Sequence, residues 1–225
     1  MNRDKQFFIV IEGIDGSGKA TQAELLAQYL NHVAGIKTEK ISFPRYESEA
    51  CGPIKMYLSG KFGSASEVNC YASSILYTVD RYASFREYFG PKMDEGYAIV
   101  ADRYTESNMV HQASKAPKDK WDEIIDWIAD LEYDKVGLPK PDLVIYLDVN
   151  PEVSKKLISK RYQGDESKRD IHEADIEFMN RSRTAALFAA QKCNWVVLEC
   201  SDDKDMRSIE DIHKDIVNIV SSSLL

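Results

Sequence analysis

The stretch that decides the fold reads Glu12-Gly13-Ile14-Asp15-Gly16-Ser17-Gly18-Lys19. It follows the apolar run 7–11 and opens a segment with helical spacing, which is the strand–turn–helix context of a phosphate-binding loop. Its glycines let the backbone curl so that N–H groups point at phosphate oxygens, and the helix N-terminus adds a favourable field. Lys19 can then reach the terminal phosphates as a point charge. The spacing predicts a nucleoside triphosphate site and disfavours a glycine-rich turn that binds nothing.

One position departs from the usual loop. Ala20 stands where Ser or Thr normally ligates magnesium, and Thr21 is displaced by one residue around the helix. Magnesium must then be held through water, ATP oxygens or carboxylates, for which Asp15 and Glu173 are the candidates. Asp102 is expected to orient the metal's waters. The residues expected to contact ATP in the loop are Gly13, Asp15, Gly16, Ser17, Gly18, Lys19, Ala20 and Thr21.

Strands and helices are predicted to alternate along the chain. The apolar runs expected to be strands are 7–12, 37–42, 98–101, 143–147 and 195–198. Segments with helical spacing begin near Lys19, Glu67, Lys118, Pro151 and Glu173. This alternation indicates βαβ units, hence an α/β fold of the P-loop NTPase type with a five-stranded parallel sheet flanked by helices. Ligands of such sheets bind beyond the carboxyl ends of the strands, where the motifs below all fall.

Composition narrows the classes of function. The chain has 225 residues, 44% of them apolar, which suits one domain, 1–225, with a single core. A net charge of −8 disfavours a nucleic-acid partner, although a local basic pocket can still hold a small phosphorylated ligand. The run 7–11 is too short for a targeting or membrane segment. The four cysteines form no CxxC pair, so we expect reduced thiols in a cytoplasmic protein without a membrane partner.

Further polar segments suit a second substrate. They are Phe-Pro-Arg-Tyr at 43–46, Tyr-Thr-Val-Asp-Arg at 77–81, Asp-Arg-Tyr-Thr-Glu-Ser-Asn at 102–108 and Lys-Arg-Asp-Ile-His-Glu at 168–173. Arg45 and Arg103 each come just past a predicted strand, and two guanidiniums converging over the sheet edge suit a dianionic monophosphate. Tyr77 and Arg81 are four apart and share a helix face. The aromatic ring can stack on a base while the guanidinium donates to a carbonyl oxygen.

Together with the loop at 12–19, the order and spacing of these segments resemble the bacterial thymidylate kinases, from about residue 8 to the last helix. The resemblance implies phosphoryl transfer from ATP to dTMP, Mg²⁺ as cofactor, and a homodimer formed through a helix such as 72–89. It places Asp15 against the sugar 3′-hydroxyl, Arg81 near thymine O4 and Asn108 near N3. The residues that it places around dTMP are Asp15, Phe43, Arg45, Tyr46, Tyr77, Arg81, Arg103, Ser107, Asn108, His111, Gln112 and His172.

The segment 161–173 has the character of a mobile lid, because it is polar, charged and interrupted by Gly164. The phosphate loop carries no arginine at its variable sites, so the charge that steadies the transferring phosphoryl must come from elsewhere, and the lid is the available source. This pattern matches the subgroup of the family whose catalytic cation lies in the lid. Arg161 is a candidate for stacking on adenine. The expected catalytic residues are Lys19, Arg103, Lys168 and Arg169.

Two alternatives remain. A deoxynucleoside kinase would share the loop and fold, but its relatives carry a carboxylate base just past the second strand, where this chain has Arg45. A nucleotide-dependent switch or inactive binding module is the second alternative, and Ala20 gives it some support. Such a module would bind nucleotide without monophosphate-dependent turnover, and Arg45, Arg81 and Arg103 would have no ligand to explain them.

Overall fold

A computed structural model of the chain describes residues 6–64, 67–161 and 176–225, with the backbone alone at 160, 161 and 176. Its strands form one parallel sheet in the order β2-β3-β1-β4-β5. They are β1 (Phe8–Gly13), β2 (Thr38–Ser42), β3 (Ala98–Asp102), β4 (Leu143–Asp148) and β5 (Val196–Glu199). Each differs by at most one residue at either end from an apolar run of the sequence, so the predicted α/β fold with a five-stranded parallel sheet is confirmed.

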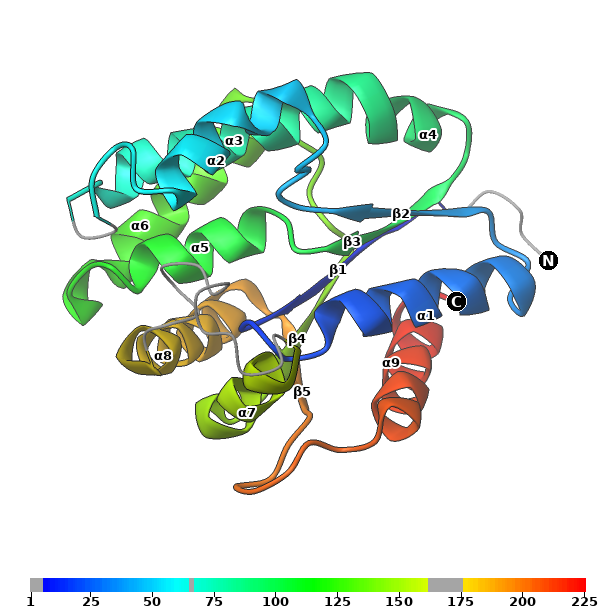
Figure 1. Cartoon of the computed structure of the whole chain (residues 1–225). Helices are drawn as coiled ribbons and strands as arrows, with labels where there is room; N and C mark the ends of the chain where they lie inside the picture. The colour runs from blue at the N-terminus through cyan, green and yellow to red at the C-terminus, as the bar shows by residue number, and fades with distance from the viewer. Residues whose placement is uncertain (1–5, 65–66, 162–175) are drawn as a thin grey trace.

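Helical segments connect the strands and cover both faces of the sheet (Figure 1). The α-helices are α1 (Lys19–His32), α2 (Gly52–Leu58), α3 (Cys70–Ser84), α4 (Gly90–Asp94), α5 (Thr105–Ala113), α6 (Trp121–Ala129), α7 (Pro151–Arg161), α8 (Ile176–Cys193) and α9 (Ile209–Leu224). Short 3-10 turns form η1 (Glu49–Cys51) and η3 (Lys118–Lys120). Two π-helical segments, η2 (Phe85–Phe89) and η4 (Asp130–Lys135), continue α3 and α6.

The two faces of β1 enter different cores, because successive side chains of a strand point to opposite sides. Phe8 and Val10 pack in a buried cluster with residues of α5, α6 and α8. Ile9 and Ile11 pack in a second cluster with residues of α1 and α9. Every residue of β1 is buried, as expected for the central strand of a parallel sheet. The sheet is thereby fixed on both sides, and the loops at the carboxyl ends of its strands are held on a rigid base.

Helix beginnings were predicted less well than strands. Those at Lys19 and Pro151 are confirmed, whereas the helix expected near Glu67 begins at Cys70 because the Asn69 side chain caps it, accepting from the Ala72 N–H at 2.8 Å. A 3-10 turn occupies 118–120 before α6, and the beginning predicted near residue 173 lies outside the described residues. Helices α2, α4, α5 and α9 were not predicted. None of the described helices is both long and apolar enough to cross a membrane.

Candidate active site

The phosphate loop joins β1 to α1 and is held from both sides. Gly16 and Gly18 have φ of 76° and 84°, a conformation that glycine adopts without strain. At Gly16 a Cβ would lie 2.7 Å from Ser154 Oγ and 2.9 Å from Ser154 O, so α7 packs against the loop too closely for any side chain. Lys19 curls back over the loop and donates from Nζ to Ile14 O at 2.9 Å. The loop therefore has the closed shape that a phosphate cradle requires.

Charged side chains gather where the loop meets the end of β3. Arg103, in the left-handed region at φ 68°, forms an ion pair with Asp15 and lies 3.3 Å from Glu12 Oε1. It also donates to Ser107 Oγ at 3.0 Å. Burial alone would raise the pKa of the Asp15 carboxyl, but the Arg103 and Lys19 cations hold it well below its usual range. Asp15 is thus ionised, and it ties the phosphate loop to the predicted acceptor motif.

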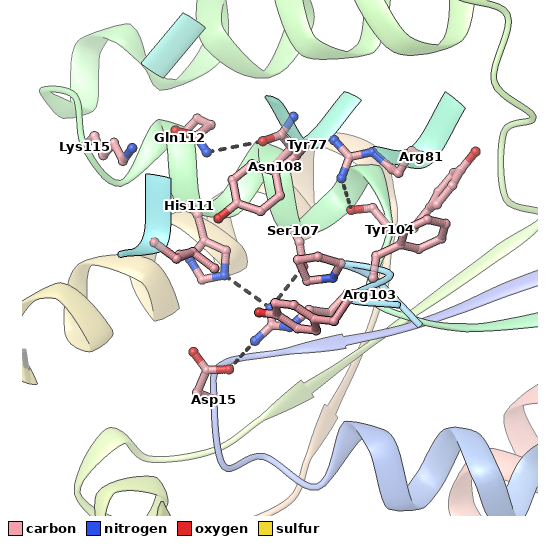
Figure 2. A pocket seen from close by; sticks show the side chains of 14 residues that line it. Asp15, Tyr77, Arg81, Arg103, Tyr104, Ser107, Asn108, His111, Gln112 and Lys115 are labelled. Atoms are coloured by element: carbon pink, nitrogen blue, oxygen red, sulfur yellow. Dashed lines mark hydrogen bonds and ion pairs between the residues drawn. The ribbon is translucent and has the colours of Figure 1, made fainter. Parts of the chain in front are cut away.

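A cavity opens directly beside this charged cluster (Figure 2). Its lining comes from the phosphate loop, the turns after β2 and β3, the helices α2, α3 and α5, and the turn after α5. The lining residues are Asp15, Phe43, Pro44, Tyr46, Leu58, Tyr77, Arg81, Arg103, Tyr104, Ser107, Asn108, His111, Gln112 and Lys115. Ten of these positions are among the twelve that the sequence assigned to dTMP. Residues separated by nearly a hundred positions in the chain therefore line one cavity, which we call the acceptor pocket.

Arg45 is not among them, so the structure does not place Arg45 and Arg103 in the lining of one cavity. Arg45 lines a neighbouring cavity against β2 and η2. Its guanidinium lies over the Tyr88 ring, 4.8 Å from the centroid, and its Nε donates to Glu47 Oε1 at 3.1 Å. The stacking and the ion pair hold the side chain in this neighbouring cavity, and sequence spacing could not reveal either partner.

Arg81 has a partner that the sequence did not indicate. Its side chain is 2% exposed and forms two hydrogen bonds with Glu132, from Nε at 2.6 Å and from Nη2 at 2.5 Å. Glu132, on η4, also accepts from Thr78 Oγ1, Thr105 Oγ1 and Asn108 Nδ2 at 2.8–3.1 Å. A single buried carboxylate therefore binds α3 and α5 together behind the acceptor pocket.

Lys115 is a second residue that sequence reasoning missed. It lies at the opposite end of the acceptor pocket from Arg81 (Figure 2), and its Nζ donates to Tyr57 Oη at 2.7 Å and to Ser73 Oγ at 3.0 Å. Burial lowers the pKa of this lysine to about 8. No carboxylate among residues 6–64, 67–161 and 176–225 forms an ion pair with it, which leaves a positive end to the pocket.

His111 contacts Arg103 and Phe178. Its Nε2 lies 3.2 Å from Arg103 Nη1, and its ring stacks on Phe178 of α8 with 11° between the planes. In the described part of the chain no group of three or more His, Cys, Asp or Glu side chains could hold a metal ion. The predicted roles of Lys168, Arg169, His172 and Glu173, and of the Arg161 side chain, fall outside the described residues.

Comparisons with known proteins agree with this geometry. The sequence model of the thymidylate kinase family matches residues 11–216. The chain is 32% identical to a thymidylate kinase of Mycobacterium tuberculosis over 184 residues, covering 80% of this chain and 83% of that protein. It is 32% identical to a thymidylate kinase of Sulfurihydrogenibium over 216 residues, covering 94% and 95%. The structure of thymidylate kinase from Candida albicans superposes with a TM-score of 0.69 at 20% identity, covering 97% of this chain and 92% of that chain, and so shares the fold. The chain belongs to the thymidylate kinase family.

Proposed function

We propose that this protein transfers the γ-phosphoryl group of ATP to the phosphate of dTMP, giving ADP and dTDP. The observation that carries the proposal is the link between loop and pocket. Asp15 and Arg103 belong to both, because Asp15 lies in the phosphate loop and pairs with Arg103 at the mouth of the acceptor pocket (Figure 2). A donor phosphate on the loop and an acceptor in the pocket would therefore meet at these two side chains.

The reaction needs positioning more than proton transfer. An oxygen of the dTMP phosphate, already ionised near neutral pH, attacks the γ-phosphorus while the bond from that phosphorus to the bridging oxygen of ADP breaks. Lys19 and Arg103 would neutralise charge on the equatorial oxygens, joined by a cation of the predicted lid, Lys168 or Arg169. Arg103 can do so because Asp15 and Glu12 raise its pKa against the effect of burial and keep it charged.

Magnesium would supply further positive charge and hold the β- and γ-phosphate oxygens in place. The residues present fit a metal bound chiefly by phosphates and water. Asp102 has a buried Oδ1 with no hydrogen-bond partner among the described residues, and so could accept from a metal-bound water. Ala20 offers no hydroxyl, and the Asp15 carboxylate is already paired with Arg103 and Lys19. Asp102 is therefore the described carboxylate best suited to this role.

Thymine would be read at the far end of the acceptor pocket. Arg81 can donate to O4 and Asn108 can meet N3, with Tyr77 as the stacking ring and Asp15 near the sugar 3′-hydroxyl. Arg45 would contact the phosphate of dTMP only after leaving the Tyr88 ring.

The test is a panel of nucleoside monophosphates incubated with ATP and magnesium, with ADP release as the readout. We expect dTMP to give the highest kcat/KM, dUMP a modestly lower value and dCMP a far lower one, because a mismatched hydrogen bond costs more than a missing methyl group. ATP turnover that does not depend on any monophosphate would instead favour a binding module. Turnover of thymidine above dTMP would favour a nucleoside kinase.

We also propose that two copies of the chain pair through α3. Four large apolar side chains on this helix, spaced by four, four and three residues, are 38–48% exposed: Tyr71, Ile75, Val79 and Tyr82. Such spacing places them on one face, which a second copy with the same face would cover.

Light scattering tests this pairing. The parent is expected at the mass of a dimer, and the double variant Ile75→Asp/Val79→Asp at the mass of a monomer. Val33→Asp is the matched control, because Val33 is 72% exposed but lies outside α3. A monomeric parent, or a dimer that survives both aspartates, would contradict the proposal.

The remaining assignments are a single domain spanning 1–225 and a cytoplasmic location. The four cysteines are free thiols, which supports a reducing compartment.

A further inference from the structure

One chain of hydrogen bonds runs along the acceptor pocket, from Lys115 at one end to Glu132, the partner of Arg81, at the other. Lys115 Nζ donates to Ser73 Oγ at 3.0 Å, and that hydroxyl donates to Gln112 Oε1 at 2.6 Å. Gln112 Nε2 then donates to Asn108 Oδ1 at 3.2 Å. Asn108 Nδ2 donates in turn to Glu132 Oε1 at 2.8 Å. We call these five residues the amide chain.

The two ends of the amide chain fix its direction. A carboxylate only accepts and an ammonium group only donates. The Ser73 hydroxyl lies closer to Gln112 Oε1, at 2.6 Å, than to Asn69 O, at 3.0 Å; when it donates to Gln112, each group between Lys115 and Glu132 receives on one side and donates on the other. Asn108 must therefore turn its Nδ2 toward Glu132, and the remaining hydrogen of Nδ2 goes to Ser74 Oγ at 2.7 Å. Its Oδ1 keeps a spare lone pair. Asn108 thus presents an acceptor, and not a donor, to a base in the pocket.

Glu132 fixes Arg81 in the same way. The Nε and Nη2 groups of Arg81 are occupied by the carboxylate, and Nη1 lies 3.4 Å from Tyr104 O, at the long end of the hydrogen-bond range. The guanidinium can therefore present N–H donors only along its remaining edge. The pocket offers a donor from Arg81 beside an acceptor from Asn108. A 4-keto pyrimidine with a hydrogen on N3 matches this order, whereas cytosine, with a 4-amino group and a bare N3, opposes it at both positions.

We propose that Glu132 is a positioning residue for base selection, which holds Arg81 and Asn108 so that the pocket accepts thymine or uracil and rejects cytosine. The inference rests on the proposed function of the chain as a dTMP kinase. Glu132 itself is not part of the pocket lining. It acts on the base through one intervening side chain, because it orients Arg81 and Asn108, the two residues proposed to contact the base.

The experiment compares the specificity ratio, kcat/KM for dTMP over kcat/KM for dCMP, in the parent and in Glu132→Gln. Glutamine has the same shape but can donate, so the Asn108 amide is free to invert. We expect the ratio to fall about tenfold or more, because both hydrogen bonds that separate the bases lose their fixed polarity. The ratio of dTMP to dUMP is expected to stay within about twofold of the parent, since a methyl group does not sense that polarity.

Glu106→Gln is the matched control. Glu106 is also a buried carboxylate, on the same helix as Asn108, but it accepts from Tyr133 and takes no part in the amide chain. Its substitution is expected to leave the dTMP to dCMP ratio unchanged. A fall of the same size in this control would show that any buried acidic side chain near the pocket matters, and would overturn the specific role of Glu132.

A second variant covers the case in which Glu132→Gln does not fold. Lys115→Glu replaces the donor at the end of the amide chain with an acceptor, at a half-buried position. The Ser73 hydroxyl would then donate to the new carboxylate and accept from Gln112 Nε2. Gln112 would therefore turn its Oε1 toward Asn108 Oδ1. Two acceptors then oppose each other, and we expect the ratio to fall about threefold or more. Because dTMP and dCMP carry the same phosphate, repulsion by the new charge cancels in the ratio.

The parent distinguishes the two proposals. A parent that shows no dTMP-dependent ADP release would overturn the proposed function itself. A parent that prefers dTMP, with variants of Glu132 and Lys115 that keep the ratio within about twofold, would leave the function standing and overturn the positioning role alone.

Discussion

Glu106 is expected to make the stability of the protein depend on pH. This residue of α5 is 2% exposed, its Oε1 accepts from Tyr133 Oη at 2.7 Å, and its Oε2 has no hydrogen-bond partner among the described residues. Burial raises the pKa of the carboxyl to about 7 from an ordinary value of 4.5. The folded state therefore keeps a proton on Glu106 in a range of pH where the unfolded chain has released it.

The sign and the size follow from proton linkage. Because the pKa is raised in the folded state, the contribution to the free energy of unfolding is complete below pH 4.5 and is lost as the pH rises through about 7. A difference of about 2.5 pKa units corresponds to about 3 kcal/mol in total, of which about 2–3 kcal/mol is lost between pH 5 and pH 8.

Urea unfolding of the parent and of Glu106→Gln at the two pH values measures this term, since glutamine cannot titrate. The variant is expected to gain about 2–3 kcal/mol relative to the parent on going from pH 5 to pH 8. Glu123→Gln serves as the control, because the Glu123 side chain is 61% exposed. The difference in the free energy of unfolding between this variant and the parent should be the same at both pH values. If the difference in the free energy of unfolding between the parent and Glu106→Gln is the same at both pH values, the pKa of Glu106 is not raised and the reasoning is refuted.

Three substitutions test the site itself. Lys19→Ala is expected to abolish ADP release with dTMP while leaving the thermal melt in place, and activity within a few-fold of the parent would exclude the assigned role. Ala20→Ser is expected to shift the magnesium concentration for half-maximal rate without being needed for activity; an inactive parent rescued only by serine would show a degenerate kinase. Arg81→Met is expected to lower kcat/KM for dTMP and to cost about 3–5 kcal/mol in urea unfolding, because it leaves Glu132 uncompensated. The double variant Arg81→Met/Glu132→Leu is expected to recover much of that stability, and equal losses in both would refute the pairing argument.

The strands of the sheet and most of the residues that line the acceptor pocket could be predicted from the sequence. Buried strands of a parallel sheet are short apolar runs between polar turns, and the glycines of the phosphate loop mark the first of them, so the strands could be placed to within one residue. Arg103 was expected at the site because parallel strands bring their carboxyl ends to one edge, whereas most of the other acceptor residues were placed by the resemblance to the thymidylate kinases. Helix α5 was missed because its polar face lines the site, and Ser107, Asn108 and His111 there interrupt the apolar pattern of a core helix.

Side-chain partners that lie far apart in the chain could not be predicted from the sequence. Glu132 lies in the segment Asp130–Lys135, where most residues are charged, a composition typical of a solvated surface, and it meets Arg81 across 51 positions of the chain. The direction of Arg45 was equally hidden, since it depends on the Tyr88 ring and the Glu47 carboxylate that happen to lie beside it. Patterns of residue type locate elements and their faces, whereas side-chain partners are decided by packing between elements.

The fixed direction of the amide chain has a consequence for inhibitors. What Arg81 and Asn108 match is a carbonyl beside an N–H, and this edge is shared by cyclic imides and lactams that contain neither a sugar nor a phosphate. Such rings are expected to compete with dTMP, and methylation at the imide nitrogen is expected to abolish the competition because it removes the one hydrogen that Asn108 can accept. An inhibitor of this enzyme therefore needs the hydrogen-bonding edge of the base but not the charged phosphate of the substrate.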